Sequence, residues 1–268
     1  MTGDVGVLAS GGCHIFSGCG FPAPGLQDFN WKPFFTIGSF GFTKPMLLAI
    51  VAALVVIGFF WAAFRKPKLV PHGVQSLGEM AILAIRDQIL RPSLGRRGDS
   101  YLPFLVSLFF FIYIMDVMEL IPVLQFPVPS RVGFVWPLVF IVYFLYLYLG
   151  FKHQGVGGYF KSMIPPGVPW PIYIILVPVE LLRFFVFQPF TLGVRLFGNM
   201  FAGHLLLTIF TIATWYLLSL SVGLLYAAGS FVLAIFVFLL ETLVTLLQAF
   251  IFTTLTATYI ASSVEPAH

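Results

Sequence analysis

A few polar residues that could do chemistry stand inside long apolar segments of this chain. Arg195 is the most demanding, because a guanidinium keeps its charge at every physiological pH and needs water or a carboxylate in front of it. We interpret it as a fixed positive charge with a functional role. The competing interpretation is a structural ion pair with Glu180 or Glu241, two carboxylates of the same apolar region.

Helical geometry divides the polar residues around Arg195 between two surfaces. On an ideal helix Asn199 lies about 40° and Glu180 about 60° from Arg195, so these three share one face. His204 lies about 180° away and must face another helix. The sequence therefore predicts a second helix packed against the first.

The second apolar segment supplies partners for both surfaces. Glu241 and Gln248 lie about 20° apart on a helix, and one antiparallel register sets His204 opposite Glu241 and Arg195 opposite Gln248. An imidazole beside a carboxylate is a titratable couple that can exchange protons near neutral pH. The alternative is a buried His204 that bonds only to a backbone carbonyl.

Composition places these residues in a membrane. Hydrophobic residues make up 59% and charged residues 9% of the chain, against about 25% charged in soluble domains. The apolar residues form uninterrupted stretches, and the basic residues between them build no aromatic-interleaved face, so nucleic acid is not an expected partner. We predict an all-α integral membrane protein.

The predicted organisation is an N-terminal tail over 1–44 and one membrane domain over 45–268. The domain has one interfacial amphipathic helix at about 74–92 and five transmembrane helices, at about 45–64, 101–121, 133–151, 168–210 and 224–262. The last two segments are each about forty residues, near 60 Å as helices, which is twice the thickness of the hydrocarbon layer. We expect a long, strongly tilted antiparallel hairpin; the alternative is two spans in each segment.

Loop charges predict the orientation. Seven of the 14 Lys and Arg residues lie in 65–97, and Lys152 and Lys161 follow the third span, whereas Arg131 stands alone in the intervening loop. By the positive-inside rule the basic loops are cytoplasmic, which puts the N-terminus outside and the C-terminus inside. The N-terminus has no cationic region before an apolar run and is not expected to be a cleaved signal peptide.

The tail holds both cysteines. Cys13 and Cys19 are compatible with one disulfide if the tail is exported, and His14 would add a third ligand for zinc. Three ligands fall short of a structural zinc site, so neither metal nor cofactor is expected.

Two motifs resemble the ATP synthase subunit a family. They are PFTLGVRLFGNMFAGH over 189–204 and MDVMELIP over 115–122, and the likeness extends through Glu241 and Gln248 to most of the chain beyond residue 40. A common bacterial form of this pattern has Glu at the position of His204 and His at that of Glu241. The exchange keeps a carboxylate and an imidazole together, which supports contact between the two positions.

The resemblance implies a proton-channel stator of a rotary ATP synthase. Arg195 would face the essential carboxylate of a rotating c-subunit ring and separate two offset half-channels. Glu241 and His204 would line the outer half-channel and Glu180 the inner one. The implied partners are the c ring, the peripheral-stalk b subunits and membrane lipids, in a bacterial inner (plasma) membrane.

The remaining polar residues of the resemblance have less defined roles. Asn199 and Gln248 would form hydrogen bonds beside Arg195. Asp116 and Glu119 receive no specific role from it; we place them at an outer vestibule, and the alternative is interfacial charges at a span end.

Other functions predict different sequence features. An enzyme would show a catalytic grouping or a phosphate-binding loop, and we find neither, so we expect a non-catalytic subunit. A self-contained ion channel or secondary transporter would show internal repeats, which we do not find. A membrane redox subunit that binds quinone or haem is a third alternative, but haem ligation would need a second ligand beside the single intramembrane His.

Overall fold

The computed structural model of the chain describes residues 21, 24–25, 35–37, 40–121, 128–162, 170–218 and 223–264. Most of the predicted tail, including Cys13, His14 and Cys19, lies outside the described residues, so its predicted features and its boundary at residue 44 stay predictions. The described part ahead of the first helix includes a small antiparallel pair of strands, β1 Phe35–Ile37 and β2 Phe40–Phe42.

Helices dominate the rest of the described chain. Five helical segments are long and apolar enough to cross a membrane: Lys44–Phe64, Val74–Leu120, Val132–Phe160, Ile174–Leu217 and Gly223–Val264. Many large apolar side chains on them, such as Leu54, Ile57 and Ile175, face outward. An outer surface of this kind suits a lipid solvent, so the predicted fold class is confirmed.

The predicted interfacial helix joins the second span without a gap. Helix α1 Lys44–Phe64 leads to α2 Val74–Ile85, and the chain continues through π-helix η4 Arg86–Leu90, α3 Arg91–Leu94 and 3₁₀-helix η5 Gly95–Tyr101 into α4 Leu102–Leu120. Gly78 allows the close contact between α1 and α2, because a Cβ there would lie 2.8 Å from Cβ of Ala63. The apolar side chains Leu77, Met80 and Leu83 of α2 stay exposed, as expected beside lipid.

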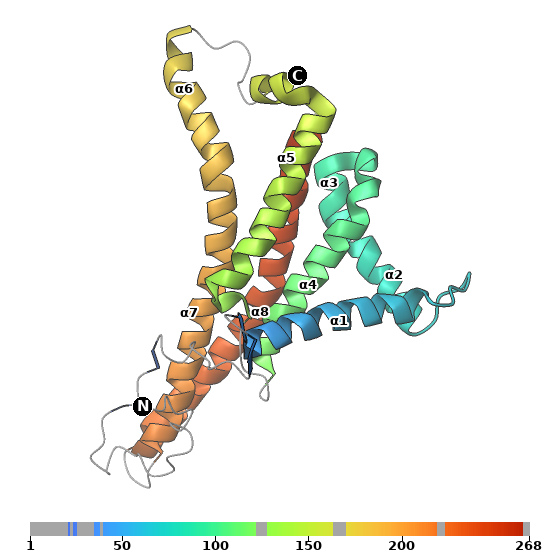
Figure 1. Cartoon of the computed structure of the whole chain (residues 1–268). Helices are drawn as coiled ribbons and strands as arrows, with labels where there is room; N and C mark the ends of the chain where they lie inside the picture. Colours follow the sequence, from blue (N-terminus) through green and yellow to red (C-terminus); the bar gives the residue numbers. More distant parts are fainter. Residues whose placement is uncertain are drawn as a thin grey trace.

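Helix α5 Val132–Ser162 extends beyond the predicted span at 133–151 because its range includes a short second helix that follows a break. Gly155 has φ 70° and ψ 162°, a conformation that residues with a Cβ rarely adopt, and it separates a short terminal helix from the main one. The ring of Tyr159 returns onto Gly150, where a Cβ would overlap it. Figure 1 shows this short piece lying across the end of α5.

The last two segments form the predicted long antiparallel hairpin. The first is α6 Trp170–Leu182, π-helix η7 Arg183–Phe187 and α7 Gln188–Leu217 in succession, and the second is the single helix α8 Gly223–Val264. α8 makes its most extensive contact with α7 and also packs on α4 and α5. In Figure 1 the C-terminal end of α7 and the N-terminal end of α8 lie at one end of the molecule, and the C-terminal end of α8 lies beside the end of α5 and α3 at the other.

Candidate functional site

Arg195 lies on the exposed face of α7, with Asn199 one turn farther along the same face. Among the described residues, no carboxylate lies within ion-pair distance of the Arg195 guanidinium. The alternative of a structural ion pair with Glu180 or Glu241 is therefore wrong within the described chain. A permanent cation on an outward face of a membrane-spanning helix needs water or an anionic partner, and the described residues supply no carboxylate for it.

Glu180 has a different partner from the one its spacing suggested. Its Oε2 accepts a hydrogen bond from Nε of Arg183 at 2.7 Å. The π-helix η7 begins at Arg183, so the helix between Glu180 and Arg195 is not the regular one that the predicted shared face assumed. Tyr146 of α5 donates its hydroxyl hydrogen to the carbonyl of Phe184, within this π-helix, with 3.4 Å between the oxygens.

Beside Arg195, α7 and α8 are joined by an amide pair. Nδ2 of Asn199 donates to Oε1 of Gln248 at 2.9 Å, and Gln248 is buried with 1% of its surface exposed. The contact agrees with the predicted antiparallel register to within one helical turn. Nε2 of Gln248 is buried without an acceptor among the described residues, which leaves one strong donor next to the face that carries Arg195.

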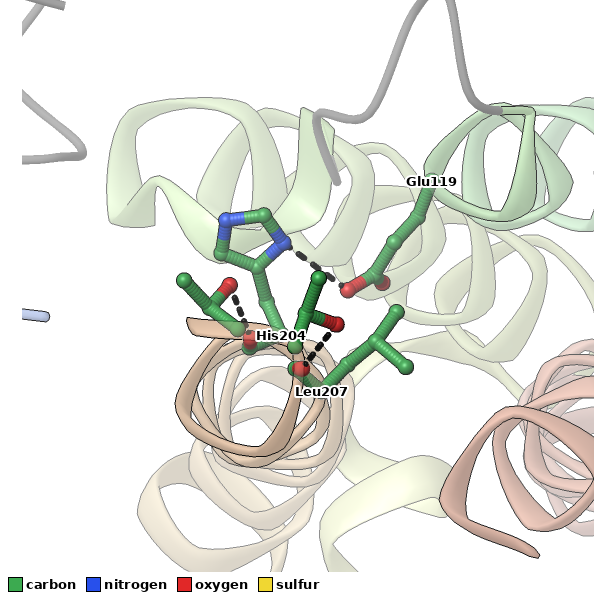
Figure 2. Close-up of polar contacts among 5 residues, drawn as sticks. Glu119, His204 and Leu207 are labelled. Carbon is green, nitrogen blue, oxygen red and sulfur yellow. Dashed lines mark hydrogen bonds and ion pairs between the residues drawn. The ribbon is translucent and has the colours of Figure 1, made fainter. Parts of the chain in front are cut away.

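His204 leaves the Arg195 face and turns toward another helix, as its spacing predicted. The sequence predicted Glu241 of α8 as its partner, whereas the observed contact is with α4: Nδ1 of His204 lies 3.1 Å from Oε1 of Glu119, as Figure 2 shows. Glu119 is 2% exposed, so the contact is shielded from solvent. The family resemblance implied no specific role for Glu119, which we placed at an outer vestibule, whereas the structure makes it a partner of the imidazole.

Three buried carboxylates, one of them that of Glu119 itself, lie together at this contact. Asp116 and Glu119 of α4 and Glu241 of α8 are each at most 2% exposed and close enough for their charges to interact. Both oxygens of Asp116, Oε2 of Glu119 and Oε1 of Glu241 are buried without a hydrogen-bond donor among the described residues. Such oxygens are costly unless a proton, a cation or water satisfies them, so the group is suited to taking up and passing on protons.

Gly203 makes room for this cluster and was not identified from the sequence. A Cβ built at Gly203 would overlap the carboxylate of Glu241, so that carboxylate lies directly against the backbone of α7. The available signal was a glycine in a helix interior, where it is disfavoured by about 1 kcal/mol relative to alanine, next to a candidate histidine.

The assembled arrangement is a fixed cation on an outer face beside an internal titratable group. Within the described part of the chain, no group of three or more His, Cys, Asp or Glu side chains is arranged to hold a metal ion. The imidazole and the carboxylates are all groups that exchange protons by hydrogen bonding. The geometry therefore supports proton transfer within a membrane span.

Comparison with known proteins relates the chain to one family. The family model described as ATP synthase A chain matches residues 46–261. ATP synthase subunit a of Streptomyces lividans is 44% identical over 96% of this chain and 92% of the relative. The proteins of that name from Frankia alni and Rhodococcus erythropolis are 38% and 37% identical, over 91% and 90% of this chain and 86% and 89% of their own lengths.

The contact at Gly203 predicts a steric effect on stability. Gly203→Ala should push the Glu241 carboxylate away from α7 and cost about 1–3 kcal/mol, as overpacking does. Gly229→Ala on α8 is the matched control, because a Cβ there meets nothing within 4 Å and alanine favours the helix. Thermal unfolding of the detergent-solubilised protein, followed by circular dichroism, should give a lower midpoint for the first variant only. Equal midpoints would contradict the contact.

Proposed function

This chain belongs to the ATP synthase A chain family, and from that premise we propose that it is the proton-channel stator of a rotary ATP synthase, in which two offset half-channels meet at Arg195. Membership of the family gives the chain a proton-channel role within an ATP synthase complex. The observation that carries the finer proposal is Arg195 itself, exposed on α7 and without a carboxylate partner in the described chain.

The missing partner of Arg195 is, in this proposal, the carboxylate of a neighbouring c-subunit ring. A ring carboxylate that has lost its proton is held opposite the guanidinium, and one that has gained a proton is neutral and free to move into lipid. The fixed charge also opposes direct passage of a proton between the half-channels. A self-contained channel would leave Arg195 facing lipid, which is costly.

The buried cluster forms the outer half-channel in this proposal. Glu241 lies seven residues nearer to the α7–α8 turn than Gln248 does, about 10 Å along α8 at 1.5 Å per residue. Protons entering from that end would meet Asp116, Glu119, His204 and Glu241 before they reach the Arg195 level. The hydrogen-bonded pair of Asn199 and Gln248 lies between this cluster and Arg195.

Glu180 contributes to the inner half-channel. It precedes Arg195 by fifteen residues, about 22 Å of helix on the side away from the cluster. Its carboxylate is 21% exposed beside Arg183 and can accept protons released near that end. The two half-channels are thereby offset along the membrane normal.

The orientation follows from where the basic residues lie. The end of α5, which carries Lys152, and α3, which carries Arg91, lie at the same end of the molecule as the C-terminal end of α8 (Figure 1). Nε2 of Gln154 donates to the carbonyl of Ser263 at 2.8 Å, which ties α5 to α8 at that end. By the positive-inside rule this end is cytoplasmic, in the plasma membrane of a bacterium, and the N-terminus is outside. The peripheral-stalk b subunits are the further partners that we propose.

The first test removes the fixed charge. In vesicles that contain the assembled complex, Arg195→Ala should abolish ATP-driven proton pumping, whereas passive proton conductance survives or rises because the barrier between the half-channels is gone. Arg96→Ala, an exposed arginine outside the site, is the control and should pump normally. Pumping that survives Arg195→Ala would refute the stator proposal.

A second test addresses the relay. Glu119→Gln keeps the size of the side chain but removes the group that exchanges a proton with His204, so ATP-driven pumping should fall about tenfold or more, as loss of a proton-transfer group does. Glu79→Gln on α2 is the matched control. His204→Ala and Glu241→Gln should show the same loss. If all three retain normal pumping, protons take another route.

A further inference from the structure

A second polar site lies far from Arg195, where α1 gives way to α2. A pocket of about 470 Å³ opens there, and it is lined by Arg65, Lys66, Lys68 and His72 together with Ala62, Ala63, Val74 and Gln75. Three side chains that carry a positive charge at neutral pH thus line one pocket at the end of a membrane-spanning helix. The proton path does not use any of these residues.

The cations of this pocket have no carboxylate partners among the described residues. Elsewhere Arg86 pairs with Asp99 and Arg91 with Asp87. Arg65 instead lies over the ring of Trp61, 4.7 Å from its centroid, and neither Lys66 nor Lys68 has a carboxylate within ion-pair distance in the described chain. The pocket therefore carries a net positive charge, even with the Glu79 carboxylate that bonds to Gln75 in its lining.

The backbone of the pocket is held in place. Gln75 is 8% exposed, and its amide bonds both backbone groups of Lys68: Oε1 accepts from the amide nitrogen at 3.1 Å, and Nε2 donates to the carbonyl at 2.9 Å. Nε2 also donates to Oε1 of Glu79 at 2.8 Å. This clamp fixes the loop while leaving the Lys68 side chain free to bind a ligand, so the site is ordered before binding.

Apolar side chains stand directly beside the cations. Leu69 is fully exposed, Val70 is 63% exposed, and Trp61 at the end of α1 is 61% exposed. A soluble anion would gain nothing from this apolar surface. A phospholipid has both parts, a phosphate for the cations and acyl chains for the apolar residues.

We propose that the pocket between α1 and α2 binds the headgroup of an anionic phospholipid, with its phosphate at Arg65, Lys66 and Lys68 and its acyl chains along Trp61, Leu69 and Val70. Guanidinium and ammonium groups are the usual binders of phosphate, and basic pockets at the cytoplasmic ends of spans suit anionic headgroups. The bound lipid would occupy the space between the end of α1 and the start of α2 and would stabilise the segment that joins them. The site does not depend on the proton path.

The experiment uses the assembled complex in phosphatidylcholine nanodiscs with a rising fraction of photoreactive phosphatidylglycerol. Label should appear in the segment 61–75. Removing two charges in Arg65→Gln/Lys68→Gln should raise the fraction needed for half-maximal labelling about 30-fold, from the contribution of each basic residue at an anionic surface. Arg96→Gln/Arg97→Gln removes two exposed charges outside the pocket and should leave labelling unchanged.

Further experiments distinguish the phosphate of a lipid headgroup from free inorganic phosphate. Photoreactive phosphatidylcholine should label the segment weakly, and tens of millimolar inorganic phosphate should not compete. The conservative variant Arg65→Lys/Lys68→Arg keeps the charges and should label like the wild type, which controls for assembly. Loss of labelling by inorganic phosphate, equal loss in both double glutamine variants, or crosslinks from this segment to another subunit in place of lipid would each overturn the proposal.

Discussion

The guanidinium of Arg195 keeps its charge under all physiological conditions, and a membrane offers it no bulk water. The described chain gives it no carboxylate, although Glu180 and Glu241 are present in the same pair of long segments. Glu180 is engaged by Arg183, and Glu241 is buried against the backbone of α7 at Gly203, eight residues beyond Arg195. The charge is therefore directed outward, and an outward charge in a membrane needs water or an anionic partner, which in our proposal lies on another molecule. Family membership and the internal geometry are both consistent with that requirement.

The buried carboxylates follow from the same arrangement. Asp116, Glu119 and Glu241 can lie inside the protein only because α4, α7 and α8 enclose them together and His204 offers a partner to Glu119. Gly203 removes the side chain that would otherwise occupy the place of the Glu241 carboxylate. A structure built only for stability would not leave several carboxylate oxygens unsatisfied, so their retention is an argument for proton transfer.

The fold could be predicted from the sequence because membrane spans are governed by the length and hydrophobicity of a segment, and both can be read from the residues. The long hairpin and the register of α7 on α8 could also be predicted, because helical periodicity fixes which residues share a face. Sequence reasoning missed the π-helix η7, the break at Gly155 and the contact of Glu119 with His204. The first two depend on packing, including Tyr146 against Phe184 and Tyr159 against Gly150. The third joins residues 85 positions apart on helices whose relative rotation no local pattern specifies.

The central claim is that two separate aqueous routes approach Arg195 from opposite sides of the membrane. It is tested most directly by single cysteines at Val177, one turn before Glu180, and at Thr208, one turn after His204, with Cys13 and Cys19 changed to serine. A membrane-impermeant thiol reagent should modify position 177 only from the cytoplasmic side and position 208 only from the opposite side, in vesicles of known orientation. Modification of both positions from the same side would contradict the account, because one continuous channel would then reach past Arg195.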